Sequence, residues 1–237
     1  MMTSALQYKA RPSLVPRKQS LTEMAYSAIK AEINAGKIPL DSFINIPEIE
    51  RQLDMSRTPI REAMLRLQTE KVVEIVPKRG IRILALSASE LAEYYQVIAG
   101  LELQAIGNIC ARKLSRTDIM PLLYALSSEE TALRSANHDA WADADEKFHR
   151  SLFILNGNTK LQETGLSFRD VIQRANFEAM RHIEPEHKER CLRDHNEVKE
   201  LLLSTSEKLA RECYLDHSKW LSAHLAEILM DKGVVRL

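Results

Sequence analysis

Three histidines and one aspartate stand at spacings that could bring them together around a metal ion. Asp145 and His149 are four residues apart, so on a helix their side chains share one face. His195 and His217 fall in two later segments that both have helical periodicity. Neutral imidazoles with one carboxylate suit a borderline divalent ion. We therefore predict a metal site, with Zn²⁺ as the expected ion and Ni²⁺ or Mn²⁺ as alternatives.

The residues around these histidines are apolar, which places the rings against a core. Phe148 flanks His149, and Val198 lies about one turn after His195. Buried polar groups without partners are costly, and one metal ion would satisfy all three rings at once. For each ring taken singly, a hydrogen-bonded structural role is the alternative. The remaining histidines are expected at the surface or at helix caps: His138, His182, His187 and His224.

A second group of residues, at the start of a predicted helix, could read DNA. Arg57 and Arg61 are four residues apart, on the face opposite an apolar stripe. An arginine can pair bidentately with guanine or grip phosphates. The hydroxyls of Ser56 and Thr58, with the free N–H groups of a helix start, suit phosphate oxygens. For any one of these arginines alone, a solvated helix face is the alternative.

Three short helices and a hairpin must position these residues. Periodicity predicts helices over 22–35, with Gly36 at the end, over 47–53, and from a Ser56 cap onward. Two β-rich runs, 72–76 and 81–84, predict a hairpin with Lys78 and Arg79 at its tip, within reach of the DNA backbone or minor groove. Together these elements predict a winged helix-turn-helix over 19–85, preceded by a flexible basic arm over 1–18.

The rest of the chain, 86–237, has a helical pattern throughout. We expect helices near 88–114, 117–135, 139–156, 158–183, 187–203 and 206–231, separated by Ser, Thr, Asn, Gly and Pro positions. This predicts an all-helical bundle of six to seven helices that holds the metal ligands. The predicted fold is therefore mostly α, with a hinge between the two domains near 84–89.

Composition and charge agree with an intracellular DNA-binding protein. Of the 237 residues, 45% are hydrophobic and 28% charged, which is ordinary for a folded soluble chain. Residues 1–85 hold 14 Lys+Arg against 9 Asp+Glu and the remainder 19 against 24, so only the front is suited to a polyanion. No apolar run approaches the roughly 20 residues of a membrane span, and the start lacks the apolar core of a secretory signal. Three scattered cysteines favour a reducing compartment, so we expect the cytoplasm.

The front of the chain resembles a known family. The stretch IPEIERQLDMSRTPIREAMLRLQTEKVVEIVPKRGIRI resembles the winged helix of GntR-family bacterial transcription regulators, and SRTPIREAMLRL is similar to that family's signature. The resemblance implies operator-contacting roles for Arg57 and Arg61. Two positions depart from the pattern: Pro47 stands where some members have a further DNA-contacting arginine, and Lys71 replaces the usual glycine before the wing.

The back of the chain resembles the FCD ligand domain of the FadR-type branch. The similarity rests on D-x-x-F-H from Asp145 to His149, on Asn-Gly-Asn at 156–158, and on the later histidine pair 22 residues apart. The resemblance implies that the aspartate and three histidines bind a divalent metal. It also makes Arg174 a candidate for holding an acidic effector. Many relatives carry an arginine four residues before a glutamate on the first helix; here Glu102 is present, but Ile98 occupies the arginine position.

Together these features predict a non-enzymatic regulator. We expect a homodimeric, metabolite-responsive repressor that binds a palindromic double-stranded DNA operator and senses a small carboxylate at the metal. A purely structural metal site is one alternative. A metalloenzyme fused to a DNA-binding domain is another, but no separate acid or base stands at a recognisable spacing, and Asp145 is needed as a ligand.

Overall fold

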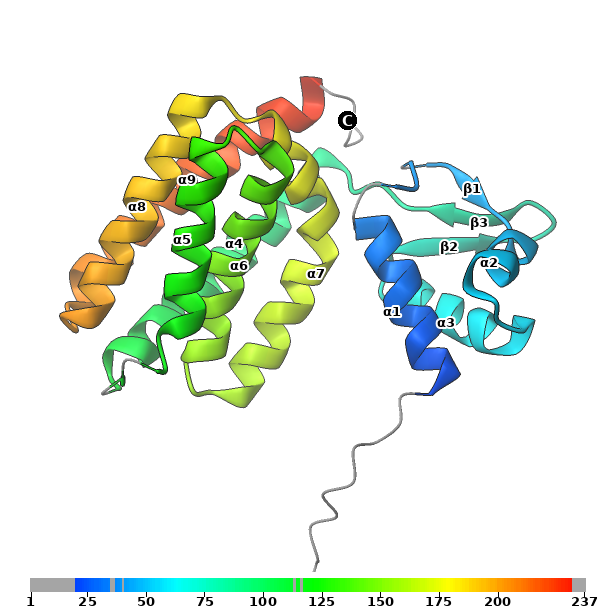
Figure 1. Cartoon of the computed structure of the whole chain (residues 1–237), viewed down its shortest axis with the longest axis horizontal. Helices are drawn as coiled ribbons and strands as arrows, with labels where there is room; N and C mark the ends of the chain where they lie inside the picture. Colours follow the sequence, from blue (N-terminus) through cyan, green and yellow to red (C-terminus); the bar gives the residue numbers. More distant parts are fainter. Residues whose placement is uncertain (1–19, 35–36, 40, 113, 116, 232–237) are drawn as a thin grey trace, which may run out of the picture.

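The computed structural model describes residues 20–34, 37–39, 41–112, 114–115 and 117–231 (Figure 1). The expected arm over 1–18 and the expected cap Gly36 lie outside these residues. We call the first group of elements the head; it contains α1 (Leu21–Asn34), β1 (Phe43–Ile44), α2 (Ile46–Leu53), α3 (Arg57–Thr69), β2 (Val73–Val76) and β3 (Gly80–Ile83). The second group, the body, contains α4 (Ala88–Cys110), α5 (Met120–Arg134), α6 (His138–Leu155), α7 (Thr159–His182), α8 (Pro185–Leu203) and α9 (Glu207–Asp231). The chain is mostly α, as predicted.

The head has its own apolar core, formed by periodic residues of its helices. α1 buries Ala25, Ile29 and Ile33 on one face, and α3 buries a matching stripe that includes Ile60 and Leu67. α2 is capped at its start by the Asn45 side chain, which accepts from the Glu48 amide. Ser56 occupies the cap position before α3, but its hydroxyl makes no capping bond within the described residues and is free for other partners.

Three antiparallel strands, in the order β1-β3-β2, form the wing. The hairpin β2-β3 was predicted, whereas the two-residue β1 is too short to leave a periodic pattern. Gly80 begins β3 with φ +110, and a Cβ there would lie 2.8 Å from the carbonyl oxygen of Ile44. Glycine is therefore needed where β1 approaches the hairpin.

The body is a bundle of six helices in the described part of the chain, within the predicted range. The largest difference from the predicted boundaries is at α4, which ends at Cys110 instead of near 114. The intervening turn explains the difference, because the Ser115 hydroxyl and amide both donate to the Asp118 carboxylate. Such local side-chain bonds compete with helix formation, so α5 begins only at Met120. None of the helices in the described ranges is long and apolar enough to span a bilayer.

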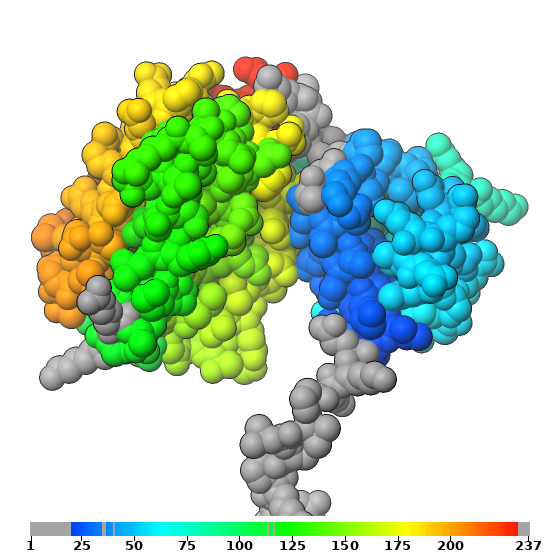
Figure 2. Space-filling view, in the orientation of Figure 1, coloured from blue at the N-terminus to red at the C-terminus, as the bar shows by residue number. Residues whose placement is uncertain are grey.

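The head and body meet along α1 and α7, and in the space-filling view they form two masses joined at this seam (Figure 2). The Lys30 ammonium of α1 lies 3.0 Å from an Asp170 carboxylate oxygen of α7. The Asn34 amide donates to the Gln173 side-chain oxygen at 2.6 Å. The hairpin tip points away from the body (Figure 1).

Candidate metal centre and nucleic-acid interface

The four residues predicted as metal ligands come together inside the body. α6 supplies Asp145 and His149, α8 supplies His195, and α9 supplies His217. All four side chains are almost fully buried. The three histidines each offer a nitrogen within 4.8 Å of the others, and the Nε2 atoms of His195 and His217 are 3.1 Å apart. Two nitrogens bound to one tetrahedral Zn²⁺ lie about 3.3 Å apart, so this spacing suits one ion.

Each histidine is held from behind by a carboxylate of another helix or turn. Glu129 of α5 has both oxygens within 3.1 Å of His195 Nδ1. Glu102 of α4 lies 3.1 Å from His149 Nδ1, and Asp194 lies 3.3 Å from His217 Nδ1. When Nδ1–H donates to a carboxylate, the Nε2 lone pair is left free for a metal. The backing carboxylates therefore orient the three rings for binding.

Asp145 provides the test of whether the site suits a cation. Both of its carboxylate oxygens are buried and have no hydrogen-bond partner among the described residues. One of them lies 3.9 Å from His149 Nε2. An isolated buried carboxylate is strongly disfavoured, and a divalent ion among these donors would compensate for it. The chemistry of the donor set thus fits a divalent metal.

Burial sets the protonation of these groups. It lowers the pKa of His149 well below its usual value and lowers the pKa of both His195 and His217 to about 4. All three rings are therefore neutral near pH 7, as metal binding requires. Burial also raises the pKa of Asp145 to about 7, so its carboxyl has to release a proton to bind a cation at lower pH.

The residues predicted to contact DNA are exposed at one end of the head. Four of them are exposed at the start of α3: Ser56, Arg57, Thr58 and Arg61. Arg57 Nε is 3.3 Å from a Glu50 carboxylate oxygen, an exposed pair that can exchange partners easily. Arg57 and Arg61 border a groove of about 610 Å³ that also includes Pro47 of α2 and Gly80 of β3.

The wing tip adds two exposed cations. Lys78 adopts a left-handed turn conformation with φ 62 at the tip of the hairpin. The Arg79 guanidinium lies 4.7 Å from the ring centre of Phe43, which is itself 38% exposed. Phe43 was missed by sequence reasoning because β1 is so short. The guanidinium of Arg79 packs over the Phe43 ring, and this contact restricts the positions that the Arg79 side chain adopts.

Comparison with known families places both halves of the chain. Residues 21–83 match the gntR family of bacterial regulatory proteins, and residues 93–219 match the FCD domain. This chain belongs to the GntR family. It is accordingly a helix-turn-helix transcription regulator with an FCD domain behind its DNA-binding head, and the family resemblance predicted from sequence is confirmed.

The chain is similar to curated transcription regulators over about half of its length and to solved structures over most of it. One is an uncharacterised HTH-type transcriptional regulator in the TAR-I ttuE-ttuC' intergenic region of Agrobacterium vitis, 39% identical over 54% of this chain and 76% of its own. Another is the Nta operon transcriptional regulator of Aminobacter aminovorans, 32% identical over 56% of this chain and 63% of its own. Among solved structures, Escherichia coli McbR/YncC is similar in fold, with a TM-score of 0.78 and 18% identity over 89% of this chain and 99% of its own.

The arginine that the structure brings to the metal centre of this GntR regulator is Arg169 and not Arg174. Arg169 is 3% exposed, pairs with Glu146, and lies 3.8 Å from Glu102, which contacts His149. Arg174 is five residues further along α7, a rotation of about 140° on a helix. It faces the seam, where it lines a small cavity with residues of the head. The structure therefore does not group Arg174 with the metal ligands.

A sequence signal for Arg169 existed. It lies on the apolar stripe of α7 with Leu161, Gly165 and Ile172, where a charged side chain has to be paired. Glu129 and Asp194 had no such signal, because neither stands at a distinctive spacing from the histidine it contacts. At the departure position, Ile98 packs in an apolar cluster of the body.

Proposed function

We propose that this GntR-family protein is a dimeric, metal-containing repressor that acts in the cytoplasm and responds to a small organic acid. In this proposal Arg57 and Arg61 read base edges of a double-stranded operator, while Ser56 and Thr58 hold phosphates. Lys78 and Arg79 hold the backbone or the minor groove beside the wing. A dimer presents two α3 helices, and these read a palindrome when they stand about 34–36 Å apart. A dimer seated on such a site excludes other proteins from that DNA, which supports repression.

The observation that carries the sensing part is the unpartnered Asp145 carboxylate beside His149 and His195, in a cluster of three carboxylate-backed histidines. We propose that these four residues hold a divalent ion, with Zn²⁺ first and Ni²⁺ or Mn²⁺ as alternatives. An ion with further coordination positions would accept a carboxylate effector. Arg174 is proposed to hold an acid at the seam instead of at the ion, because its Nη1 is buried there without a hydrogen-bond partner in the described structure. The effector alters repression only if it binds one arrangement of the dimer better than another.

A structural metal is the second candidate role for the site. Its support is the near-complete burial of all four donors, because four protein ligands can close a tetrahedral site. In that version the ion stabilises the body and no acid reaches it. The two versions differ in whether a small acid changes the metal-loaded protein.

The proposal can be tested with an operator selected from random DNA and with protein whose metal content has been measured. We expect Arg61→Ala to weaken operator binding by about 1–3 kcal/mol if it reads a base. Arg134→Ala, at an exposed arginine of the body, is the matched control and should bind like the wild type. Small mono- and dicarboxylates should then shift the melting temperature and the operator affinity of the metal-loaded protein. If none of them does, the structural version of the site holds.

A further inference from the structure

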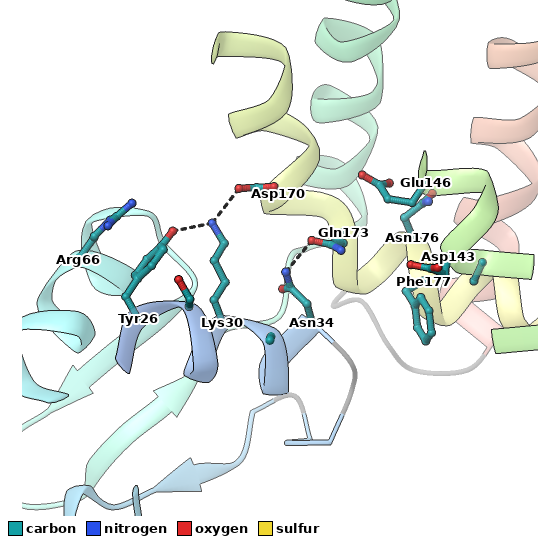
Figure 3. A pocket seen from close by; sticks show the side chains of 13 residues that line it. Tyr26, Lys30, Asn34, Arg66, Asp143, Glu146, Asp170, Gln173, Asn176 and Phe177 are labelled. Atoms are coloured by element: carbon teal, nitrogen blue, oxygen red, sulfur yellow. Dashed lines mark hydrogen bonds and ion pairs between the residues drawn. The ribbon is translucent and has the colours of Figure 1, made fainter. Parts of the chain in front are cut away.

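A chain of polar contacts starts in the head at Lys30. Its side chain is 12% exposed, and its ammonium lies within 3.0 Å of Tyr26, Glu70 and Asp170. Figure 3 draws its contacts with Tyr26 and Asp170. An ammonium has three donors, so these three acceptors use all of them. Glu70 follows α3 directly and also pairs with Arg66 of that helix. Lys30 thus joins the recognition helix to α7 of the body.

The chain continues through the body to the metal centre. Asp170 contacts Arg150 at 2.8 Å, and Arg150 contacts Glu146 at 3.2 Å. Glu146 pairs with Arg169, which lies 3.8 Å from Glu102. Glu102 in turn contacts Nδ1 of His149 at 3.1 Å. Charges alternate at each step from Glu70 to Glu102: Glu70, Lys30, Asp170, Arg150, Glu146, Arg169, Glu102.

The seam around Lys30 is open enough for the head to move. A cavity of about 530 Å³ lies on one side and is lined by both head and body, including Lys30, Asp170 and Phe177 (Figure 3). A second cavity of about 380 Å³ also borders Lys30 and Asp170, with Tyr94 and Phe168 on its body side. The Lys30–Asp170 ion pair therefore connects head and body between two cavities, and it does not lie within a packed interface. If the Lys30–Asp170 ion pair is lost, little apolar packing beside it remains to hold the head in place.

We propose that Lys30 is a positioning residue and that the alternating ion pairs carry the state of the metal centre to α3. The inference rests on the proposed metal site. A metal held by the candidate ligands would restrain the His149 ring, whose Nδ1 contacts Glu102, and Glu102 lies 3.8 Å from Arg169. Asp170, Arg150, Glu146 and Arg169 each pair with the member on either side of them, so a shift at one end displaces the next member. A coupling path of this kind is a set of physical contacts whose alternative arrangements both sites can bias.

The test is hydrogen exchange measured by mass spectrometry on the full-length protein, metal-free and loaded with Zn²⁺. In the wild type, Zn²⁺ should slow exchange in α1 by about fivefold or more, the lower end of typical coupling between sites. Lys30→Met keeps the side-chain length but removes the charge, and it should abolish this slowing. Lys37→Met is the matched control, since Lys37 is 63% exposed and its ion pair among the described residues is with Glu32. Its α1 should respond to Zn²⁺ like the wild type.

A second variant keeps the test decisive if Lys30→Met folds poorly. Asp170→Asn breaks the same pair from the body side, and the double variant should respond no differently from either single variant. Lys30→Arg should restore part of the response. If α1 of Lys30→Met still responds to Zn²⁺ as the wild type does, or if Zn²⁺ binds the wild type without slowing exchange in α1, the inference is wrong. The proposed function is judged separately, by metal content and by operator affinity with and without a small acid.

Discussion

At the residue scale, the centre is defined by how its histidines are oriented. Each ring has a carboxylate at Nδ1, and the three carboxylates come from three different places in the chain. This arrangement fixes the tautomer that leaves Nε2 free, and it costs the protein a concentration of buried negative charge. A divalent cation offsets that charge. The carboxylate-rich donor set therefore fits a divalent metal.

The raised pKa of Asp145 predicts how zinc affinity depends on pH. In the metal-free protein its carboxyl is protonated below about pH 7, because burial disfavours the charged form. Zinc must then displace one proton, so affinity should fall about tenfold, or about 1.4 kcal/mol, for each unit that the pH drops below 7. His195 and His217 stay neutral down to about pH 5, since burial lowers the pKa of each to about 4. Zinc titration between pH 5 and 8 measures this slope.

Asp145→Asn is the control for that titration. It removes the titrating carboxyl but keeps Glu102, whose pKa burial also raises to about 7. The variant should bind zinc more weakly, with a pH slope smaller by about one proton. A wild-type affinity that does not change between pH 5 and 7 would contradict the prediction.

Glu129 should matter for zinc although it is not one of the four predicted ligands. It is fully buried, contacts His195, and has an oxygen within 4.8 Å of ligand atoms of both Asp145 and His195. Glu129→Gln keeps the shape but removes the charge behind that ring, so zinc affinity should drop by about 10–100-fold. Glu130→Gln, the same change on the next residue, is exposed and paired with Arg134, and it should leave zinc affinity unchanged. Equal affinities for the two variants, measured by competition with a chelating dye, would remove Glu129 from the site.

At the element scale, the turn between α3 and β2 departs from its family pattern. Lys71 stands where the family usually has glycine, and it adopts a left-handed conformation with φ 56. Its amide bonds to the Gln68 carbonyl, which closes the turn that aims the wing. A side chain with a Cβ is disfavoured in this region, so the turn holds strain that glycine would not.

Lys71→Gly should therefore stabilise the head. The expected gain in the free energy of unfolding is about 0.5–1 kcal/mol, because relief of the left-handed strain exceeds the extra entropy of glycine in the unfolded chain. Lys71→Ala removes the side chain beyond Cβ but keeps the strain that Cβ causes, so it isolates the backbone effect and should show no gain. Urea unfolding of the full chain reports both. A glycine variant that is less stable than the alanine variant would show that the turn is not strained.

The elements were more predictable than their contacts. Helical periodicity predicted α4 to α9, because each helix buries one face, and only the Ser115–Asp118 turn shifted a boundary by several residues. Two-residue β1 could not be predicted, since it forms only by pairing with β3. The four metal ligands share a recognisable spacing, whereas their backing carboxylates lie on α4, α5 and α8 and meet them only through tertiary packing. Arg169 and Arg174 show most clearly what sequence alone could not predict. They are five residues apart on α7, yet Arg169 lies at the candidate centre and Arg174 at the seam.

At the scale of the whole molecule, five helices of the body meet at the candidate metal centre. The four candidate ligands come from α6, α8 and α9, and the backing carboxylates add α4 and α5. The head has a separate apolar core in which none of these helices takes part. Metal binding should therefore stabilise the body directly and reach the head only through the seam.

Removal of zinc should lower the melting temperature of the body. A ligand present at 100 times its dissociation constant stabilises the folded state by about 2.7 kcal/mol, and this corresponds to about 5–10 °C for a domain of this size. Calorimetry of zinc-loaded and chelator-treated protein measures the shift. His217→Ala should lose the response to zinc, while His224→Ala, on the same helix but packed beside Trp220 and His187, should keep it. If His217→Ala is stabilised by zinc as much as the wild type, the ion binds elsewhere and the four residues do not form the site. If zinc raises the melting temperature of the wild type and of His224→Ala but not of His217→Ala, the ion stabilises the five helices that meet at this buried centre.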